Sequence, residues 1–398
     1  MSTNSTISHL SCSECQAHFD HLELQTFCPT CTKPLLVNYD LEKASSRLSK
    51  SALFQRAPDM WRYRELLPVL QQRNIVSFGE GLTPLIRVDK VAAKIGLSDV
   101  WVKDEGQIPT GSFKARGLAM AVSKALELGV RELAIPTAGN AGGALAAYGV
   151  KAGMTCHIFM PKDVPQINYM EAKLTGANVT LVEGLISDCG KMVAEKKDEM
   201  GWFDVSTLKE PYRLEGKKTM GLELAEQFDW RLPDVVIYPT GGGTGLIGMW
   251  KAFGELREMG WLIGDFPRMI SVQSEGCDPI TRAFEAGKFV SEFFDNAQTV
   301  AAGLRVPKAF GDTLILEALQ ASGGKAVSVP DEEILNSMTE LARGEGLIVC
   351  PEGAATWSAL KKLRDAGDID PNDRVVLFNT GLGLKYPEVL AQLTKNEA

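Results

Sequence analysis

One lysine of this sequence, Lys114, has neighbours that a solvent-exposed lysine does not need. It lies in the stretch PTGSFKARG (109–117), directly after Phe113 and at the expected start of a helix. Apolar neighbours lower the pKa of a lysine by desolvation, and the positive end of the helix dipole adds to that effect. A lysine with a lowered pKa can form a Schiff base and transfer protons. The alternative, an ordinary surface charge, is the usual role of a single lysine.

Histidine, the side chain most often used for acid–base catalysis, is almost absent from the body of the chain. Three of the four histidines lie near the N-terminus (His9, His18 and His21), and His157 lies in an apolar run that is typical of a strand. We expect His157 to be a hydrogen-bonded core residue. The composition argues against a serine–histidine triad. Lys114 is therefore the best base that the sequence offers.

A glycine-rich turn between an apolar run and a helical segment is typical of an anion-binding site. It lies in PTGGGTGLIG (239–248) and consists of Gly241, Gly242, Gly243, Thr244 and Gly245. Backbone N–H groups can approach an anion closely where side chains are missing, and a helix N-terminus favours negative charge. We therefore expect a phosphate cradle here rather than a plain tight turn.

The same turn also fits the dinucleotide pattern G-x-G-x-x-G, from Gly243 to Gly248, with Glu275 at the end of the next expected strand. This pattern would indicate an NAD-dependent dehydrogenase. The pattern lies in the middle of the chain, however, and a dehydrogenase gives Lys114 no role. We keep the dehydrogenase as the less favoured alternative.

Two further turns place single polar side chains at the ends of expected strands. PTAGNAGG (136–143) contains Asn140, whose amide can orient a ligand or cap the following helix. FNTGLG (378–383) contains Thr380, whose hydroxyl can end a turn or face a ring nitrogen. The residues of these two segments leave both alternatives open.

Four of the eight cysteines form two CxxC pairs that are separated by twelve residues: Cys12, Cys15, Cys28 and Cys31. Two such pairs are typical of a zinc ribbon, in which four thiolates surround the metal as a tetrahedron. Neither an open coordination position nor surrounding basic residues are evident, so a closed structural zinc site is favoured over a catalytic one. A pair of knuckles that binds no metal is the alternative.

The elements that must position these residues alternate regularly along the chain. Short apolar runs such as ELAIPT, TCHIFMP and DVVIYPT alternate with helical segments. This pattern predicts α/β domains with parallel sheets that are covered by helices on both faces. Ligands bind at the carboxyl ends of such strands, and the unusual turns lie at those ends.

Length and composition limit the classes of protein. A chain of 398 residues exceeds what one hydrophobic core usually serves, so we expect at least two domains. The formal net charge of −8 argues against nucleic-acid binding. No apolar run reaches the length of a membrane span, and the N-terminus lacks the pattern of a secretory signal. We expect a cytoplasmic protein with no nucleic-acid or membrane partner.

Several segments together closely resemble the threonine synthases, which are fold type II pyridoxal-phosphate enzymes. The resemblance runs from about Gly79 to Tyr386, in the family's order. It rests on KDEGQIPTGSFKARG, TAGNAGG, EGKKTMGLE, PTGGGTGLIGMWKAF and NTGLGLKYP. The two CxxC pairs also resemble the zinc-ribbon extension of some family members.

For the fold, the resemblance implies two doubly wound three-layer αβα domains of the tryptophan synthase β type, preceded by a zinc-ribbon-like segment. We expect that segment at 8–40. The large cofactor-binding domain is expected to combine 41–100 with 212–398, and the small domain to cover 101–211. A homodimer is also expected.

For the site, the resemblance implies that Lys114 holds pyridoxal 5'-phosphate as a Schiff base, with Phe113 beside the ring. Asn140 would form a hydrogen bond with the 3-hydroxyl of the cofactor, and the turn 241–245 would wrap its phosphate. Thr380 would face the pyridine nitrogen, where a neutral hydroxyl does not enforce protonation.

The implied reaction converts O-phosphohomoserine and water to threonine and phosphate, which makes the enzyme a carbon–oxygen lyase. Lys114 would remove the α-proton and serve in later proton transfers. The substrate phosphate requires cationic and hydroxyl donors. The candidates are Lys103, Ser112, Arg116, Lys217 and Lys218. A solvated surface charge is the alternative for at least half of these four cations.

Two departures from the family leave the exact substrate open. Many relatives have aspartate after the lysine, where this chain has Ala115, and hydroxyl residues around the asparagine, where it has Ala141 and Gly142. Such hydroxyls often contact a substrate carboxylate. A serine/threonine dehydratase and a phosphoserine-using sulfonate synthase are therefore the alternatives within the family.

Overall fold

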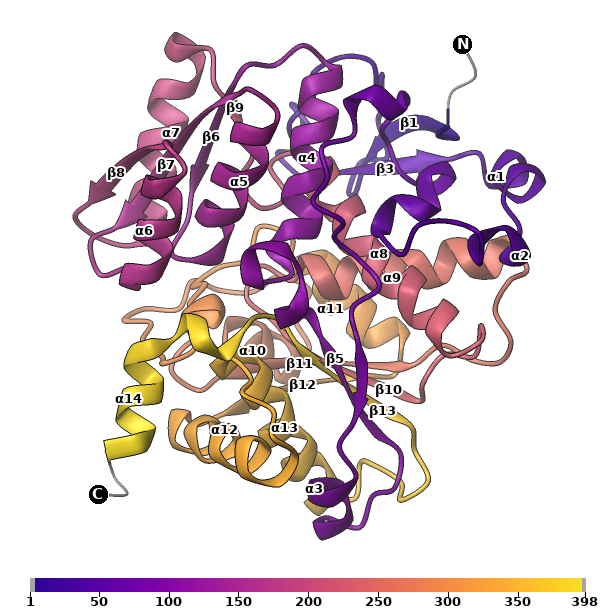
Figure 1. The fold of residues 1–398 in the computed structure, drawn as a ribbon, viewed down its shortest axis with the longest axis vertical. Coiled ribbons are helices and arrows are strands. Elements are labelled where there is room, and N and C mark those ends of the chain that lie inside the picture. The colour runs from indigo at the N-terminus through magenta and orange to yellow at the C-terminus, as the bar shows by residue number, and fades with distance from the viewer. Residues whose placement is uncertain (1–3, 396–398) are drawn as a thin grey trace. The chain divides into compact units, whose positions relative to one another are not determined.

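The computed structural model describes residues 4–395, which divide into two compact units (Figure 1). The first unit contains the chain up to Leu82, Lys114–Glu223 and Lys251–Trp261, and the second contains Thr83–Phe113, Leu224–Trp250 and the chain from Leu262. One passage of the chain from the second unit to the first therefore lies between Phe113 and Lys114. Two long helices, α8 (Tyr212–Gln227) and α9 (Thr244–Glu258), contribute residues to both units.

The N-terminal part of the first unit is a small antiparallel sheet. β1 (Ile7–Cys12) lies between β2 (His18–Phe19) and β3 (Leu35–Tyr39) and pairs with both strands. Helices α1 (Leu41–Arg47) and α2 (Lys50–Leu53) follow β3. Each begins after a side chain that accepts a backbone N–H group of its first turn, Asp40 for α1 and Ser49 for α2, which is the usual way to satisfy a helix N-terminus.

The second sheet of the first unit has four parallel strands in the order β8-β7-β6-β9. The strands are β6 (Glu132–Pro136), β7 (Thr155–Pro161), β8 (Asn178–Val182) and β9 (Phe203–Asp204). The helices between them are α4 (Lys114–Glu127), α5 (Asn140–Lys151), α6 (Gln166–Leu174) and α7 (Ile186–Met200). α5 and α7 pack against β6 and β7. The alternation of strands and helices predicted from the sequence is confirmed here.

His157 of β7 has the hydrogen-bonded position that the sequence predicts. Its Nε2 lies 2.7 Å from Oε2 of Glu132 on the neighbouring strand β6, and its ring stacks on Trp202 with 4.3 Å between the centroids. The side chain is largely buried. These contacts explain His157 as a structural residue.

The second unit contains a six-stranded sheet in the order β12-β11-β10-β13-β5-β4. All neighbouring pairs are parallel except β4 and β5. The strands are β4 (Leu85–Arg87), β5 (Val100–Asp104), β10 (Val235–Pro239), β11 (Arg268–Ser274), β12 (Lys325–Val329) and β13 (Val375–Asn379). The helices are α3 (Asp89–Lys94), α10 (Pro279–Glu285), α11 (Asp312–Ala321), α12 (Asp331–Glu345), α13 (Pro351–Asp365) and α14 (Pro387–Lys395). Short 3₁₀ turns connect several of these elements.

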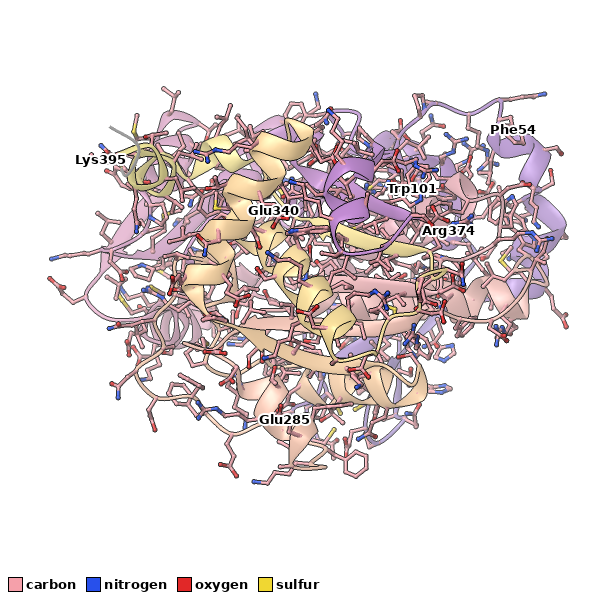
Figure 2. All side chains as sticks on the ribbon, turned by 90° about the horizontal axis from the view of Figure 1, so that it is seen from below. Phe54, Trp101, Glu285, Glu340, Arg374 and Lys395 are labelled. Carbon is pink, nitrogen blue, oxygen red and sulfur yellow. The ribbon has the colours of Figure 1, made fainter. Side chains whose placement is uncertain are left out.

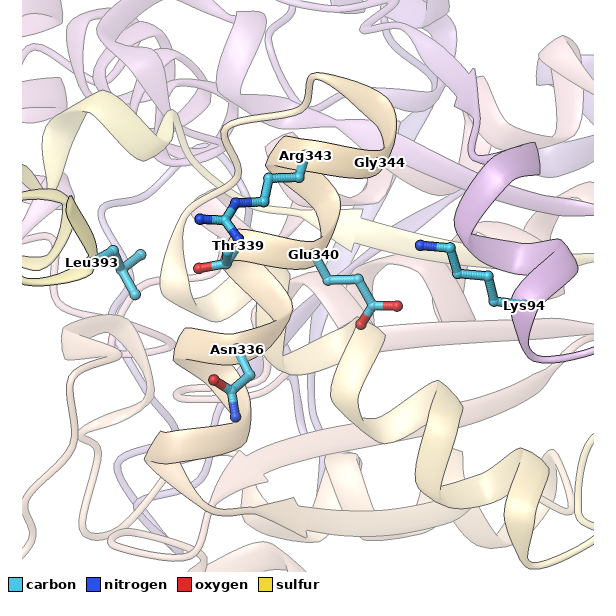
Figure 3. Close-up of a pocket in the computed structure, with 7 residues that line it drawn as sticks. All are labelled: Lys94, Asn336, Thr339, Glu340, Arg343, Gly344 and Leu393. Atoms are coloured by element: carbon cyan, nitrogen blue, oxygen red, sulfur yellow. The ribbon is translucent and has the colours of Figure 1, made fainter. Parts of the chain in front are cut away.

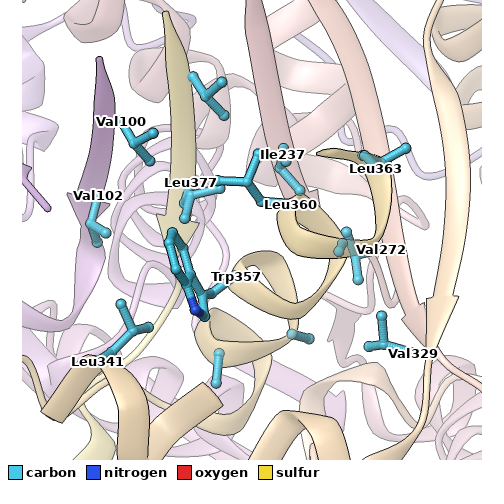
Figure 4. Close-up of a cluster of buried hydrophobic side chains, with 14 of the residues drawn as sticks. Val100, Val102, Ile237, Val272, Val329, Leu341, Trp357, Leu360, Leu363 and Leu377 are labelled. Carbon is cyan, nitrogen blue, oxygen red and sulfur yellow. The ribbon is translucent and has the colours of Figure 1, made fainter. Parts of the chain in front are cut away.

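The core of the second unit forms where α13 packs against β10, β11 and β13. Figure 4 shows Trp357 and Leu360 of α13 beside strand residues that include Leu377 and Ile237. All five residues of β10 and all five of β13 are buried. Central strands of a parallel sheet are covered on both faces, so they read as continuous apolar runs.

The amino ends of β5 and β13 are joined by polar contacts around Asp99. Its carboxylate accepts hydrogen bonds from Trp101 Nε1 at 2.6 Å and from Arg374 Nε at 2.9 Å, two residues that Figure 2 labels. This edge lies opposite the carboxyl ends of the strands, where the unusual turns are found. In the part of the chain that the structure describes, no helix is long and apolar enough to cross a membrane.

Candidate active site

Lys114 is the first residue of α4 and belongs to the first unit, whereas Phe113 belongs to the second. The backbone before Lys114 is fixed to the end of β13. The N–H group of Phe113 donates to the carbonyl of Thr380 at 3.0 Å, and Ser112 forms an antiparallel bridge with Gly381. Lys114 thus directly follows a residue that is bonded to Thr380. The structure therefore joins two of the segments that the sequence singled out.

The glycine-rich turn connects β10 to α9, and three of its glycines have no room for a side chain. A Cβ at position 241 would lie 2.3 Å from the carbonyl oxygen of Gly303, and one at 245 would lie 2.0 Å from the hydroxyl of Tyr238. Gly243 has a φ of +71°, which L side chains rarely adopt. Because α9 begins at Thr244, the turn presents the backbone N–H groups of a long helix. These features fit a bound phosphate group.

Thr380 follows β13 and is buried beside the N-terminus of α13. Its Oγ1 lies 3.9 Å from Sγ of Cys350, the residue that caps α13. Cys350 also donates its backbone N–H to Oδ1 of Asn379 at 3.1 Å. Burial raises the pKa of the Cys350 thiol well above its ordinary value, so this thiol beside Thr380 is uncharged. A neutral hydroxyl in this position fits an unprotonated ring nitrogen.

Asn140 is the first residue of α5, in the first unit, and Gly139 occupies the N-cap position. The capping alternative for Asn140 is therefore wrong. Gly142 packs tightly, since a Cβ there would lie 2.4 Å from Cε of Met160 and 3.0 Å from Cγ2 of Thr137. Packing therefore explains why position 142 has glycine and not a hydroxyl residue. The glycine also leaves this position without a side chain that could contact a substrate carboxylate.

The four candidate cations for substrate phosphate are all buried, so the surface alternative is wrong for them: Lys103, Arg116, Lys217 and Lys218. Lys103 Nζ donates to the carbonyl of Thr83 at 2.7 Å and to Oε1 of Gln227 at 2.8 Å, all within the second unit. The other three cations belong to the first unit. Ser112 is also buried, and its hydroxyl has no hydrogen-bond partner among residues 4–395.

Arg116 forms a buried ion pair with Glu223, a residue of α8. Its Nη2 lies 2.8 Å from Oε2 of Glu223, and its Nη1 donates to Oγ1 of Thr219 at 2.9 Å. Both charged side chains are completely buried. The backbones also meet here, because a Cβ at Gly216 would lie 2.1 Å from the carbonyl oxygen of Arg116. The guanidinium therefore has a structural partner that the sequence did not indicate.

Lys217 and Lys218 differ in their surroundings. Lys217 packs on α4, where a Cβ added to Gly117 would lie 3.0 Å from its Cε. Lys218 Nζ lies 2.6 Å from Glu215 and 2.9 Å from Glu255. Burial lowers the pKa of Lys218, although both carboxylates oppose this effect. Both lysines stay predictions as substrate contacts.

A cluster of buried charges in the first unit connects β3 to α8 and α9. The hydroxyl of Tyr39 donates to Oε2 of Glu215 at 2.7 Å, and Lys218 Nζ lies 3.9 Å above the tyrosine ring. Lys251 pairs with Glu215 at 3.1 Å. Burial opposes the ionisation of Glu215. The positive charges of Lys218 and Lys251 outweigh the effect of burial, so the pKa of Glu215 is lowered. The cluster ties the N-terminal sheet to α9 and to α8, the helix that carries Lys217 and Lys218.

The four clustered cysteines come together at one end of the N-terminal sheet: Cys12, Cys15, Cys28 and Cys31. Their sulfur atoms all lie within 4.8 Å of one another, and Cys12 and Cys28 are buried. Tetrahedral zinc with Zn–S bonds of about 2.3 Å requires S–S distances of roughly 3.8 Å. The Cys15–Cys28 distance is 3.7 Å, and Glu14 N–H donates to Cys12 Sγ at 3.4 Å. The donor set fits a structural zinc ion.

A cavity of about 490 Å³ lies in the second unit, and Figure 3 shows the residues that line it. It is lined by Lys94, Asn336, Thr339, Glu340, Arg343, Gly344 and Leu393. These residues belong to α3, α12 and α14, which carry none of the predicted site residues. We assign it no part in the chemistry.

A model of the family described as "Pyridoxal-phosphate dependent enzyme" matches residues 76–381. The chain is 37% identical to the threonine synthase of Methanosarcina acetivorans, over 96% of this chain and 93% of that protein. It is 36% identical to the threonine synthase of Methanocaldococcus jannaschii, over 95% of this chain and 93% of that protein.

Solved structures agree on the fold. Threonine deaminase isoform 2 from Solanum lycopersicum is similar with a TM-score of 0.68 at 19% identity, covering 88% of this chain and 95% of that one. Diaminopropionate ammonia lyase from Escherichia coli has a TM-score of 0.68, with 83% of this chain and 94% of that one covered. The predicted fold type II architecture and pyridoxal phosphate as cofactor are confirmed. The chain belongs to the pyridoxal-phosphate-dependent enzyme family and, within it, is a relative of the threonine synthases.

Proposed function

We propose that the protein is a threonine synthase that converts O-phosphohomoserine and water to threonine and phosphate. The observation that carries this proposal is the 36–37% identity to threonine synthases over almost the whole chain. The glycine-rich turn at the start of α9 and the lysine that follows Phe113 supply the two features that this chemistry requires. The dehydrogenase alternative is wrong, because residues 76–381 match a different cofactor family.

In this proposal the chain's own residues divide the work. Bound pyridoxal phosphate supplies an electron sink that stabilises negative charge at the substrate α-carbon. The amine of Lys114 binds the cofactor and then carries protons to and from the substrate carbons. The backbone N–H groups of 241–245 hold the cofactor phosphate, Phe113 flanks the ring, and Asn140 and Thr380 orient it.

The substrate phosphate is proposed to bind near the start of α4 and α8. Ser112, Lys217 and Lys218 are the proposed donors there, together with Arg116, and Lys103 is the proposed donor from β5. Arg116 and Lys218 already have carboxylate partners. A bound phosphate would therefore compete with these carboxylates for the same charges.

The first experiment is the visible spectrum of the purified protein. We expect an absorbance band from lysine-bound cofactor that is lost in Lys114→Ala, whereas Lys103→Ala, which changes another buried lysine, retains it. A protein without this band, or a Lys114→Ala variant that keeps it, would contradict the assignment of Lys114.

The second experiment is a substrate panel with detection of free phosphate and amino acids. We expect phosphate release together with threonine formation from O-phosphohomoserine. Keto-acid formation from threonine would favour the dehydratase, and a sulfonate product from phosphoserine and sulfite would favour the sulfonate synthase. The predicted homodimer and cytoplasmic location are separate expectations, which light scattering and cell fractionation test.

A further inference from the structure

A buried carboxylate in the first turn of α13, Glu352, connects two segments near the proposed cofactor site. Its Oε1 accepts a hydrogen bond from the backbone N–H of Gly303 at 2.6 Å and another from the hydroxyl of Tyr386 at 3.0 Å. The residue is only 4% exposed. All three residues belong to the second unit. No motif of the sequence singles out Glu352.

Gly303 connects this carboxylate to the glycine-rich turn. The carbonyl oxygen of Gly303 would lie 2.3 Å from a Cβ at position 241, so it packs directly against the backbone of Gly241. On its other side, a Cβ at position 303 would lie 2.8 Å from Oε1 of Glu352, and its next two nearest atoms also belong to Glu352. The carboxylate therefore fixes one side of a glycine whose other side supports the turn.

The second oxygen of Glu352, Oε2, is buried and has no hydrogen-bond partner within residues 4–395. A buried charged group with an unsatisfied oxygen is costly for stability. An apolar side chain at this position of α13 would avoid that cost. The other oxygen, Oε1, is bonded to Gly303 and Tyr386.

We propose that Glu352 is a positioning residue for cofactor phosphate: it holds Gly303 against Gly241 and so sets the shape of the turn 241–245. Tyr386 donates a second hydrogen bond to the same carboxylate oxygen, Oε1. The inference rests on the proposed role of this turn in phosphate binding. It extends that role to a residue more than one hundred positions away in the sequence.

The test measures the affinity of the apoprotein for pyridoxal phosphate, by absorbance titration, together with the melting temperature of each apoprotein. We expect Glu352→Ala to raise Kd by at least about tenfold. Glu352→Gln keeps an oxygen that accepts the Gly303 N–H and is expected to stay within about threefold of the wild type. Tyr386→Phe removes only one donor and is the matched control, with the same small effect expected.

A double-variant cycle makes the test specific to the contact. In the wild-type background, Gly303→Ala collides with Glu352 and is expected to weaken cofactor binding by at least about tenfold. In Glu352→Ala, the space is vacant, so the added Gly303→Ala change is expected to alter Kd by less than about twofold. If Glu352→Ala does not fold, Gly303→Ala alone decides, because it disturbs the same contact without removing the charge.

Equal Kd values in wild type, Glu352→Ala and Gly303→Ala would overturn the inference, as would a lowered melting temperature with unchanged Kd. Gly241→Ala separates this result from a failure of the proposed site. If Gly241→Ala weakens binding while Glu352→Ala does not, the turn binds phosphate and Glu352 does not position it. If Gly241→Ala has no effect either, the phosphate assignment of the turn itself is wrong.

Discussion

The buried ion pair between Arg116 and Glu223 gives a prediction that separates structural support from substrate binding. In Glu223→Gln the guanidinium of Arg116 remains completely buried and loses the carboxylate that lies 2.8 Å from its Nη2. Removing one partner of a buried pair costs about 3–5 kcal/mol, because the other charge stays uncompensated. We therefore expect Glu223→Gln to destabilise the first unit by about this amount.

The assay is calorimetric unfolding of the apoprotein. For a folding unit of roughly 200 residues, each kcal/mol shifts the melting temperature by about 2–4 °C. The expected decrease for Glu223→Gln is therefore about 6–20 °C. The control is the double variant Arg116→Met with Glu223→Leu, which removes both charges. Replacing a complete buried pair by apolar side chains is often neutral or stabilising by about 1–4 kcal/mol, so the double variant should melt near or above the wild type.

A melting temperature of Glu223→Gln within about 2 °C of the wild type would refute this reasoning. The activity of the stable double variant then tests the predicted substrate contact of Arg116. If the guanidinium also binds substrate phosphate, the double variant folds but has a raised KM for O-phosphohomoserine. An unchanged KM would leave Arg116 with a structural role alone.

Three further predictions concern other parts of the molecule. Gly245→Ala places a Cβ 2.0 Å from the hydroxyl of Tyr238. In the absorbance titration of the apoprotein with pyridoxal phosphate, we therefore expect at least about tenfold weaker binding. Unchanged binding would contradict the packing argument. Cys28→Ser removes one of the four sulfur ligands, so elemental analysis should show the loss of one zinc per chain. The control Cys189→Ser should retain the zinc. A wild-type protein without zinc would disprove the metal assignment. Burial raises the pKa of Glu210 to about 7, above its value of about 4.5 in the unfolded chain. The stability that protonated Glu210 contributes is thus complete below about pH 4.5 and is lost as the pH rises through 7. Urea titrations of the wild type and of Glu210→Gln measure this effect. Between about pH 4.5 and 7, the free energy of unfolding of the wild type should fall by about 3 kcal/mol relative to that of Glu210→Gln. A difference between the two free energies that does not vary with pH would contradict the raised pKa of Glu210.

Local features of the sequence indicated the alternation of strands and helices and singled out the candidate site residues. The glycine-rich turn, the lysine at the start of α4 and the two CxxC pairs are each contained in a short segment, so residue types and spacing were enough to single them out as candidates. The apolar runs of β10 and β13 predicted buried parallel strands for the same reason. His157 could also be assigned, because an apolar strand leaves an imidazole little alternative to a hydrogen-bonded position.

The partners of the buried charges could not be predicted in this way. Arg116 and Glu223 are 107 positions apart, and Tyr39 and Glu215 are 176 positions apart. A charged side chain carries no local mark of burial, so the sequence left a solvated position open for cations that the structure buries.

Read without coordinates, the chain shows the resemblance that implies the cofactor, the alternation that indicates parallel α/β domains, and the two CxxC pairs, because all three are patterns of residue types along the chain. The folded chain was needed to show that Arg116 and Lys218 pair with carboxylates, that Gly142 packs against Met160, and that Glu352 accepts the N–H of Gly303, whose carbonyl oxygen packs on Gly241. These facts depend on the distance between segments that are far apart in the chain. That distance is set by the packing of the whole unit and not by any single motif.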